Sequence, residues 1–286
     1  MTDDAGTLYV SSSDGSAPGD LASSGSPGGH SQARGTASTS DRTPVVFVHG
    51  AMDRSASFAK VRGLLSTHPT LAYDRRGYGK SVHLGPAASF VDHVDDLVTV
   101  LGGRRALLVG HSYGGNVCLR VAAEHPGLVH GLVIFEAPMS WEDWWPSTAG
   151  SSTIAIGDAH GPEAAAEGFM RRIVGDAAWE ALNEQTKAAR RAEGRALLVD
   201  LAGLRGRGRP YEPAAIGCPA VIGHGGLSQA HQIRSSVELH SLLQHAGRST
   251  PAVLRSIDRA GHGAHRSHAV EFAGLVNEAL ALAHGA

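Results

Sequence analysis

Residues 106–124 read ALLVGHSYGGNVCLRVAAE, and this stretch decides the fold of the chain. A short apolar run, ALLV, is followed at once by the turn GHSYGG, and a helical pattern begins directly after the turn. Ser112 is therefore predicted to lie on a sharp turn between a buried strand and a helix. Such a turn lifts the serine hydroxyl clear of the sheet and directs the next backbone N–H, that of Tyr113, at a developing oxyanion.

The G-x-S-x-G spacing alone is a weak signal for a nucleophile. With 37 glycines among 286 residues, it occurs by chance about once in two chains of this composition. A similar spacing at residues 226–230 also follows an apolar run, but it lacks the second glycine and a tight helix start. The position of Ser112 between a strand and a helix therefore carries the prediction, and a glycine-rich turn with an incidental serine is the alternative.

Strand-like and helix-like segments alternate from residue 43 to the end of the chain. The predicted strands are short, continuous apolar runs at residues 44–48, 70–73, 106–109, 132–135, 220–222 and 252–257. The predicted helices lie at residues 57–65, 90–101, 113–124, 232–245 and 268–283. This alternation predicts an α/β fold, in which a mostly parallel central sheet has helices on both faces.

Composition limits the remaining possibilities. Residues 1–42 are rich in Ser and Gly and are predicted to be a flexible N-terminal segment, with a possible weak first strand at residues 7–10. The formal net charge of −2 gives no field that would attract nucleic acid or an anionic membrane. Cys118 and Cys218 are too few for a disulfide framework, and no signal or membrane-spanning pattern is found. We therefore expect a cytoplasmic protein that acts on a small molecule.

Four motifs in order resemble the α/β-hydrolase superfamily over about residues 43–270. They are VVFVHGAM, YDRRGYGKS, GHSYGG and the segment AGHG at residues 260–263. The resemblance implies a core formed by residues 43–138 and 214–286, with a serine nucleophile. Dehalogenases and epoxide hydrolases of this superfamily carry Asp at the position of Ser112, so their chemistry is disfavoured.

Residues 139–213 contain no clear strand and are predicted to be a helical cap, inserted after the strand that the superfamily counts as its sixth. Open α/β sheets bind ligands at the carboxyl ends of their strands, where such a cap would lie. Trp141 and Trp144, at its start, either line a substrate pocket or pin the cap to the core. Six arginines between residues 190 and 209 are interpreted as a solvated basic face, with an anion-binding site as the alternative.

The resemblance also implies the oxyanion hole and the general base. The N–H of Ala51, after the HG turn, would join that of Tyr113, and the side chain of Met52 would line the pocket. His262 follows the last predicted strand and keeps the superfamily's chain order of serine, acid and histidine. His265 and His268 follow at a spacing of three, but no Asp, Glu or Cys stands beside them in the sequence, so no metal site is expected.

The acid departs from the superfamily's usual pattern. The carboxylate is usually found in a segment of the type HGxxD, but the equivalent stretch here is HGGLS at residues 224–228. No Asp or Glu occurs between Glu212 and Glu238. Glu136 ends the apolar strand LVIF, a position that a subset of the superfamily uses for its acid. We therefore predict Glu136 as the third catalytic group, with a solvated loop carboxylate or a serine–histidine dyad as the alternatives.

These observations predict a serine hydrolase that cleaves a small carboxylic ester, lactone or thioester through an acyl-enzyme. The expected catalytic residues are Ser112, His262 and Glu136. No cofactor is expected, and the oligomeric state is left open. A carbon–carbon bond hydrolase, or a non-catalytic binding member of the fold, is the alternative.

Overall fold

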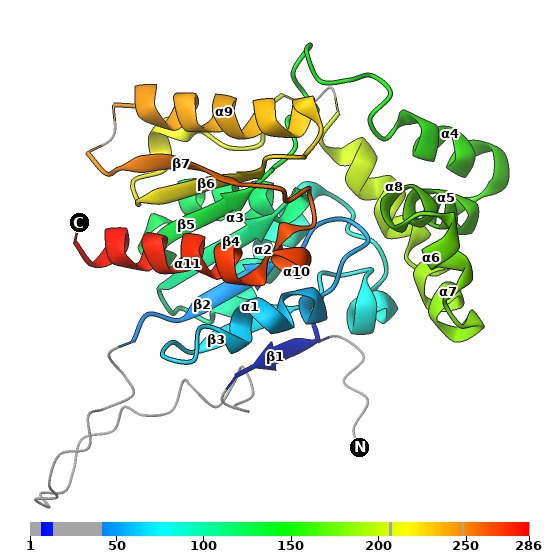
Figure 1. Cartoon of the computed structure of the whole chain (residues 1–286), viewed down its shortest axis with the longest axis horizontal. Coiled ribbons are helices and arrows are strands. Elements are labelled where there is room, and N and C mark those ends of the chain that lie inside the picture. Colours follow the sequence, from blue (N-terminus) through cyan, green and yellow to red (C-terminus); the bar gives the residue numbers. More distant parts are fainter. Residues whose placement is uncertain (1–6, 14–41, 206–207, 248, 286) are drawn as a thin grey trace, which may run out of the picture.

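One seven-stranded sheet organises the molecule (Figure 1). The computed structural model describes residues 7–13, 42–205, 208–247 and 249–285. The strands are β1 (Val10–Ser12), β2 (Val45–Val48), β3 (Thr70–Tyr73), β4 (Ala106–His111), β5 (Val129–Phe135), β6 (Ala220–Gly225) and β7 (Ala252–Ile257). Their order in the sheet is β1-β3-β2-β4-β5-β6-β7, and β1 alone pairs antiparallel. The predicted α/β fold with a mostly parallel sheet is confirmed.

Helices cover both faces of the sheet, which explains why the central strands are apolar throughout. On one face pack α2 (Phe90–Leu101), α3 (Tyr113–Glu124) and α9 (Ala230–His245). On the other face pack α1 (Ala59–Gly63) and α11 (Ala269–His284), with the short α10 (Ala264–Ser267) beside them. Successive residues of a strand point to opposite faces, so Val46 joins the first core and Phe47 the second.

Five helices lie between β5 and β6 and gather at one end of the molecule in Figure 1. They are α4 (Ser151–His160), α5 (Pro162–Val174), α6 (Asp176–Glu180), α7 (Glu184–Arg191) and α8 (Gly194–Gly203). Since only β1 precedes β2 in the described part of the chain, the strand that the superfamily counts as sixth is β5 here. All five helices fall within residues 139–213, and the division of the chain into a core and a cap stays a prediction.

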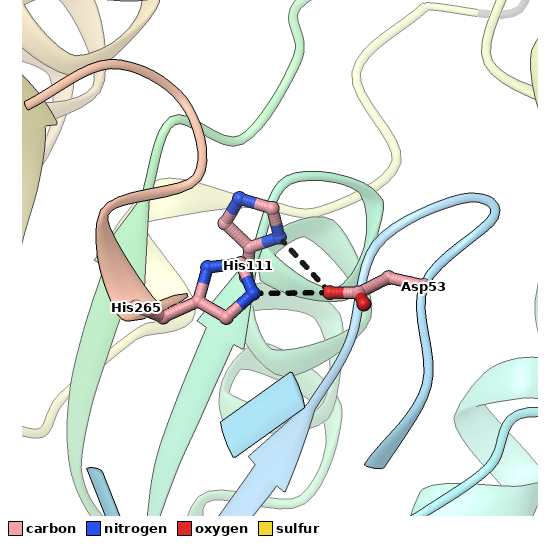
Figure 2. Close-up of side chains that lie close together, drawn as sticks. All are labelled: Asp53, His111 and His265. Atoms are coloured by element: carbon pink, nitrogen blue, oxygen red, sulfur yellow. Dashed lines mark hydrogen bonds and ion pairs between the residues drawn. The ribbon is translucent and has the colours of Figure 1, made fainter. Parts of the chain in front are cut away.

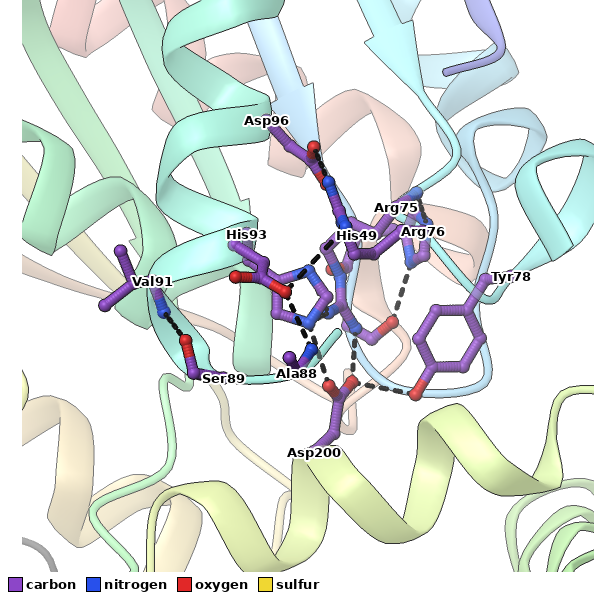
Figure 3. A network of polar contacts seen from close by, with 12 residues as sticks. His49, Arg75, Arg76, Tyr78, Ala88, Ser89, Val91, His93, Asp96 and Asp200 are labelled. Atoms are coloured by element: carbon purple, nitrogen blue, oxygen red, sulfur yellow. Dashed lines mark hydrogen bonds and ion pairs between the residues drawn. The ribbon is translucent and has the colours of Figure 1, made fainter. Parts of the chain in front are cut away.

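Two buried carboxylates, Asp200 of α8 (Figure 3) and Glu193 in the turn before it, fasten this helical insertion to the loops after β3 and β2. Asp200 accepts hydrogen bonds from Arg75 at 2.8 Å and from the Tyr78 hydroxyl at 2.7 Å, and His93 Nε2 lies 3.0 Å from it. Burial alone would raise the pKa of Asp200, but Arg75 and His93 lower it more, so the group stays ionised. Glu193 pairs in the same way with Arg54 at 2.8 Å. The negative charges of Asp200 and Glu193 in the insertion are therefore compensated by Arg75 and Arg54 of the loops after β3 and β2.

The N-terminal strand lies later in the chain than predicted. The structure places β1 at Val10–Ser12, where Val10 pairs with Tyr73 of β3, and only Val10 falls within the predicted residues 7–10. The Arg62 guanidinium donates to the Ser11 hydroxyl at 2.8 Å and to its carbonyl at 3.0 Å, which supports polar residues in this edge strand. Most of the predicted flexible segment 1–42 lies outside the described residues. No helix in the described ranges is long and apolar enough to cross a membrane.

Candidate active site

Ser112 lies on the predicted turn between β4 and α3. Its backbone has φ 53° and ψ −126°, a left-handed conformation that costs a residue with a side chain about 1–3 kcal/mol. The surroundings hold it there, because the Ser112 N–H donates to the Phe135 carbonyl at 2.8 Å. A Cβ on Gly114 would lie 2.3 Å from the Val48 carbonyl oxygen, so only glycine lets the turn pack against β2. This tight packing fixes the serine at the end of the strand.

The loop after β2 approaches the serine closely. A Cβ on Gly50 would lie 2.9 Å from the Cβ and 3.3 Å from the hydroxyl oxygen of Ser112. The Arg75 N–H donates to Nε2 of His49, so Nδ1 of that ring carries the proton and donates to the Gly50 carbonyl at 2.7 Å. Burial and the charge of Arg75 lower the pKa of His49 to about 4, which keeps the ring neutral. In a trans peptide the C=O and the N–H point in opposite directions, so the Ala51 N–H points away from His49.

The predicted acid and base are in contact. Nδ1 of His262 lies 2.5 Å from Oε2 of Glu136, and the other carboxylate oxygen accepts the Gly225 N–H at 2.7 Å. The side chain of Glu136 is fully buried, whereas that of His262 is 30% exposed. Burial alone would raise the pKa of Glu136. The contacts with His262, with the nearby Ser228 hydroxyl and with Gly225 outweigh burial, so the pKa is lowered and the carboxylate is ionised.

Adjacency of β5 and β6 explains how the end of β5 can serve in place of the superfamily's usual acid position. Phe135 pairs with Gly223 in the sheet, and the Glu136 N–H donates to the Gly223 carbonyl at 3.2 Å. Ser228 occupies the usual acid position, and its hydroxyl favours the ionised form of Glu136. The two strand ends therefore meet at one place, and the carboxylate reaches the histidine from the neighbouring strand.

His111, directly before the serine, was not predicted as a site residue. Its Nε2 donates to the His262 carbonyl at 2.9 Å, and the two rings lie 4.6 Å apart. This contact holds the loop between β7 and α10 against the turn that carries Ser112. The only sequence signal for such a role is that His111 occupies the x of G-x-S, which is also where β4 ends.

The predicted pocket residues lie at the junction of the insertion and the core. Met52 is buried against Met170 and Trp179 of the insertion. Trp141 packs edge-on against Tyr211 at 6.1 Å, and the Arg234 guanidinium lies 4.3 Å from the ring centre of Trp144. Both tryptophans are partly buried against the main core. These contacts are those expected of residues that pin the insertion, and a role in a substrate pocket stays a prediction.

A hollow of about 660 Å³ lies between α2, α3 and α8. Tyr113 lines it, together with Phe90 and Tyr211. Neither the three predicted catalytic residues nor the three predicted pocket residues belong to its lining. The hollow therefore meets the candidate active site only through the ring of Tyr113.

Two arginines of the predicted basic face, Arg190 and Arg191, pair with carboxylates, whereas Arg195 and Arg209 are exposed. Arg190 donates to the Met52 carbonyl at 3.0 Å and lies 3.3 Å from Glu193. Arg191 pairs with Glu167 at 2.7 Å. Arg207 lies outside the described residues. The described arginines nearest the core thus take part in holding the insertion.

Comparison with known proteins identifies the family of the chain. The sequence matches the alpha/beta hydrolase family over residues 45–275. An sn-1-specific diacylglycerol lipase of Danio rerio is 33% identical over 102 residues, which are 34% of this chain and 32% of the relative. A 2-(acetamidomethylene)succinate hydrolase of Mesorhizobium japonicum is 34% identical over 96 residues, which are 32% of this chain and 34% of the relative. The matched part thus spans about a third of each of these relatives.

Solved structures extend the likeness to nearly the whole chain. A structure of an N-acyl homoserine lactone degrading enzyme matches with a TM-score of 0.62, covering 95% of this chain and 96% of that one. Its sequence is only 19% identical, so this likeness shows the fold and no more. The family match covers most of the chain, from β2 to within α11. The chain therefore belongs to the alpha/beta hydrolase family.

Proposed function

We propose that this protein is a serine hydrolase that cleaves a small carboxylic ester, lactone or thioester through an acyl-enzyme. In this proposal Ser112 is the nucleophile, His262 the general base and Glu136 the acid. The observation that carries the proposal is the 2.5 Å contact between a fully buried glutamate and a partly exposed histidine. A buried carboxylate on Nδ1 leaves the other ring nitrogen, Nε2, free to accept a proton.

The first half of the reaction forms the acyl-enzyme. His262 Nε2 takes the hydroxyl proton as the Ser112 oxygen attacks the carbonyl carbon of the substrate. Glu136 stabilises the resulting imidazolium and keeps its own charge. The N–H groups of Ala51 and Tyr113 stabilise the tetrahedral oxyanion, and each such donor is worth about 2.7–4 kcal/mol. His262 then returns the proton to the departing alcohol or thiol.

The second half regenerates the serine. His262 removes a proton from water, the hydroxide oxygen attacks the acyl carbon, and a second oxyanion forms in the same hole. Collapse of this intermediate breaks the bond to Ser112, and His262 returns the proton to the serine oxygen. The products are a carboxylic acid and, from the first half, an alcohol or a thiol, while a lactone gives one hydroxy acid.

The relatives support an acyl substrate without fixing which one. Their names refer to a diacylglycerol lipase and to a hydrolase of 2-(acetamidomethylene)succinate. The runner-up is a carbon–carbon bond hydrolase, which shares the serine and the histidine. A non-catalytic binding protein is the less favoured candidate, because a carboxylate contacts His262 even though the usual acid position holds Ser228.

Labelling with a fluorophosphonate probe tests the nucleophile, and a panel of p-nitrophenyl esters, lactones and thioesters tests the substrate class. We expect the wild type to be labelled once and Ser112→Ala to be neither labelled nor active. Ser228→Ala is the matched control, since Ser228 lies in the second small-x-Ser-x-small stretch, and it should still be labelled. A folded wild type that is not labelled would favour the binding protein, and turnover of a vinylogous diketone but not of esters would favour the carbon–carbon hydrolase.

A further inference from the structure

A second group of histidine and carboxylate side chains (Figure 2) adjoins the candidate active site, since the rings of His111 and His262 lie 4.6 Å apart. It consists of Asp53, His111 and His265, whose nearest nitrogen and oxygen atoms all lie within 4.8 Å of one another. Asp53 comes from the loop after β2, His111 ends β4, and His265 lies in α10. Figure 2 shows both rings directed at the one carboxylate. The proposed hydrolysis uses none of the three.

His111 presents a buried lone pair to this group. A carbonyl only accepts hydrogen bonds, so the contact of Nε2 with the His262 carbonyl at 2.9 Å places the ring proton on Nε2. A neutral imidazole has one N–H, so with the proton on Nε2 the lone pair lies on Nδ1. Nδ1 is buried with no hydrogen-bond partner among the described residues, and it faces Oδ2 of Asp53 at 4.0 Å.

A histidine that ligates a metal through one ring nitrogen usually donates a hydrogen bond from its other ring nitrogen to an acceptor such as a carbonyl. The outer hydrogen bond fixes the tautomer and aims the lone pair inward. In His111 the carbonyl of His262 provides that bond. A lone pair facing a carboxylate is unfavourable by itself, and a cation between the two would satisfy both.

The other two groups are held in place by their neighbours. Nε2 of His265 lies 3.1 Å from Oδ2 of Asp53, and the Ser57 hydroxyl donates to the same oxygen at 3.0 Å. The His265 ring packs against Phe58 at 4.8 Å and Phe272 at 6.0 Å. Asp53 is 15% exposed, so the group is open to solvent on the side of this carboxylate.

The donor set matches one class of ion. Two imidazole nitrogens and one carboxylate oxygen are ligands that zinc accepts, and three protein ligands leave a fourth position for water. Ligands about 2.0–2.1 Å from a tetrahedral ion lie about 3.4 Å from each other. The separations of 3.1 Å and 4.0 Å around Asp53 bracket this value. Oxygen-seeking ions such as Mg²⁺ and Ca²⁺ fit such a set poorly.

We propose that Asp53, His111 and His265 form a binding site for a divalent ion of the zinc class. The ion would tie together the loop after β2, the end of β4 and the segment that follows His262. These segments carry the proposed oxyanion donor, the nucleophile and the base. The site is structural in this proposal and does not depend on whether the protein is a hydrolase.

Zinc alone tests the site in the full-length protein. The protein is first freed of metal by dialysis against a chelator, and zinc binding is then measured by equilibrium dialysis with elemental analysis. We expect one zinc per chain, a higher midpoint of thermal unfolding, and visible absorption bands of four-coordinate cobalt when Co²⁺ replaces zinc. Ser112→Ala should bind zinc as the wild type does, which separates this proposal from the proposed function.

Two ligand variants and one control make the test specific. Asp53→Asn and His265→Gln should each weaken zinc binding more than about 100-fold, beyond the 10–100-fold typical of an outer-sphere change. His268→Gln removes the next histidine along the chain, which lies outside the group, and should bind like the wild type. If His265→Gln does not fold, the partly exposed Asp53 carries the test. The proposal is overturned if the wild type binds no stoichiometric zinc, if zinc binding by Asp53→Asn is unchanged, or if His268→Gln lowers it equally.

Discussion

Two histidine–carboxylate pairs lie next to each other at the end of the sheet, with their histidines three residues apart. In the first, Glu136 is fully buried beside His262, whose side chain is 30% exposed. In the second, Asp53 is 15% exposed beside His265, whose side chain is only 2% exposed. The group that reaches the solvent is thus the histidine in one pair and the carboxylate in the other.

This difference teaches which pair can act on a substrate. A general base needs one ring nitrogen held by the acid and the other within reach of the proton that it removes. His262 meets the first condition, because Glu136 holds its Nδ1, and its side chain is partly exposed. The His265 ring packs against Phe58 and Phe272, and the exposed member of this pair is the carboxylate. The first pair therefore suits proton transfer, and the second suits a cation.

The largest effect is expected from breaking the first pair. Glu136→Gln keeps the shape of the side chain but removes the charge that stabilises the imidazolium of His262. We expect kcat for a p-nitrophenyl ester to fall about 10⁴-fold, as for loss of the corresponding carboxylate in a serine protease triad. Glu238→Gln, on the exposed side of α9, is the control. A kcat within about tenfold of the wild type would favour the dyad that works without a charged acid.

A third histidine–carboxylate pair, His93 with Asp200, is closed on both sides and already neutralised by Arg75. Asp200→Asn would leave Arg75 buried without its counter-charge, so we expect a loss of about 3–5 kcal/mol in the free energy of unfolding by urea. Asp158→Asn, at an exposed position of α4, should change this free energy by less than about 0.5 kcal/mol. A loss below about 1 kcal/mol in Asp200→Asn would mean that Arg75 finds another partner or water.

The second pair should contribute less. In metal-free protein, Asp53→Asn keeps an oxygen for the His265 N–H but loses the charge, and a charge-assisted hydrogen bond is worth about 1.5–3 kcal/mol. Urea unfolding at pH 7 measures this difference. A variant as stable as the wild type would indicate that Asp53 and His265 are not paired in the metal-free protein.

The pH dependence of that difference follows from the direction of the pKa shift. Burial alone would raise the pKa of Asp53, but His265, His49 and His111 together lower it well below its usual value. The stabilisation is therefore complete above the unfolded pKa of about 3.9 and is lost as the pH falls below it. The gap in stability between the wild type and Asp53→Asn should narrow below about pH 4. A gap that widens as the pH falls would contradict the shift.

The sequence predicted the helices and strands better than the contacts between side chains. Helices and strands follow from local patterns, whereas a contact depends on how distant segments pack. The helices of residues 90–101 and 113–124 were predicted to the residue, and the stop signals Gly102-Gly103 and Pro126-Gly127 follow them in the sequence. Glu136 was predicted as the acid because a charge directly after four apolar residues needs a partner, and the segment HGGLS carries no acid. Its contact with His262 was expected because parallel strands end at the same edge of the sheet.

The second pair escaped prediction because no motif in the sequence links its two members. The spacing of His262, His265 and His268 was judged without Asp53, which lies 212 residues before His265 in the chain. Only the rule that parallel strands end on one edge of the sheet links the two segments, and that rule gives no side-chain direction. Asp200 escaped for a similar reason, since no motif links it to its partner Arg75, 125 residues away.

The smallest effect is expected at His268, which continues the spacing of His262 and His265 in the sequence but lies outside both pairs in the structure. His268 continues the spacing of three, but it has no carboxylate partner among the described residues, and its ring contacts the hydroxyl of Ser267 at 2.9 Å. We expect His268→Gln to change the free energy of unfolding by less than about 0.5 kcal/mol, and kcat by less than about twofold. If this substitution instead lowers kcat as strongly as Glu136→Gln, the loop between β7 and α11 works as one unit. The contrast between the two pairs would then reflect their shared loop rather than the exposure of each ring.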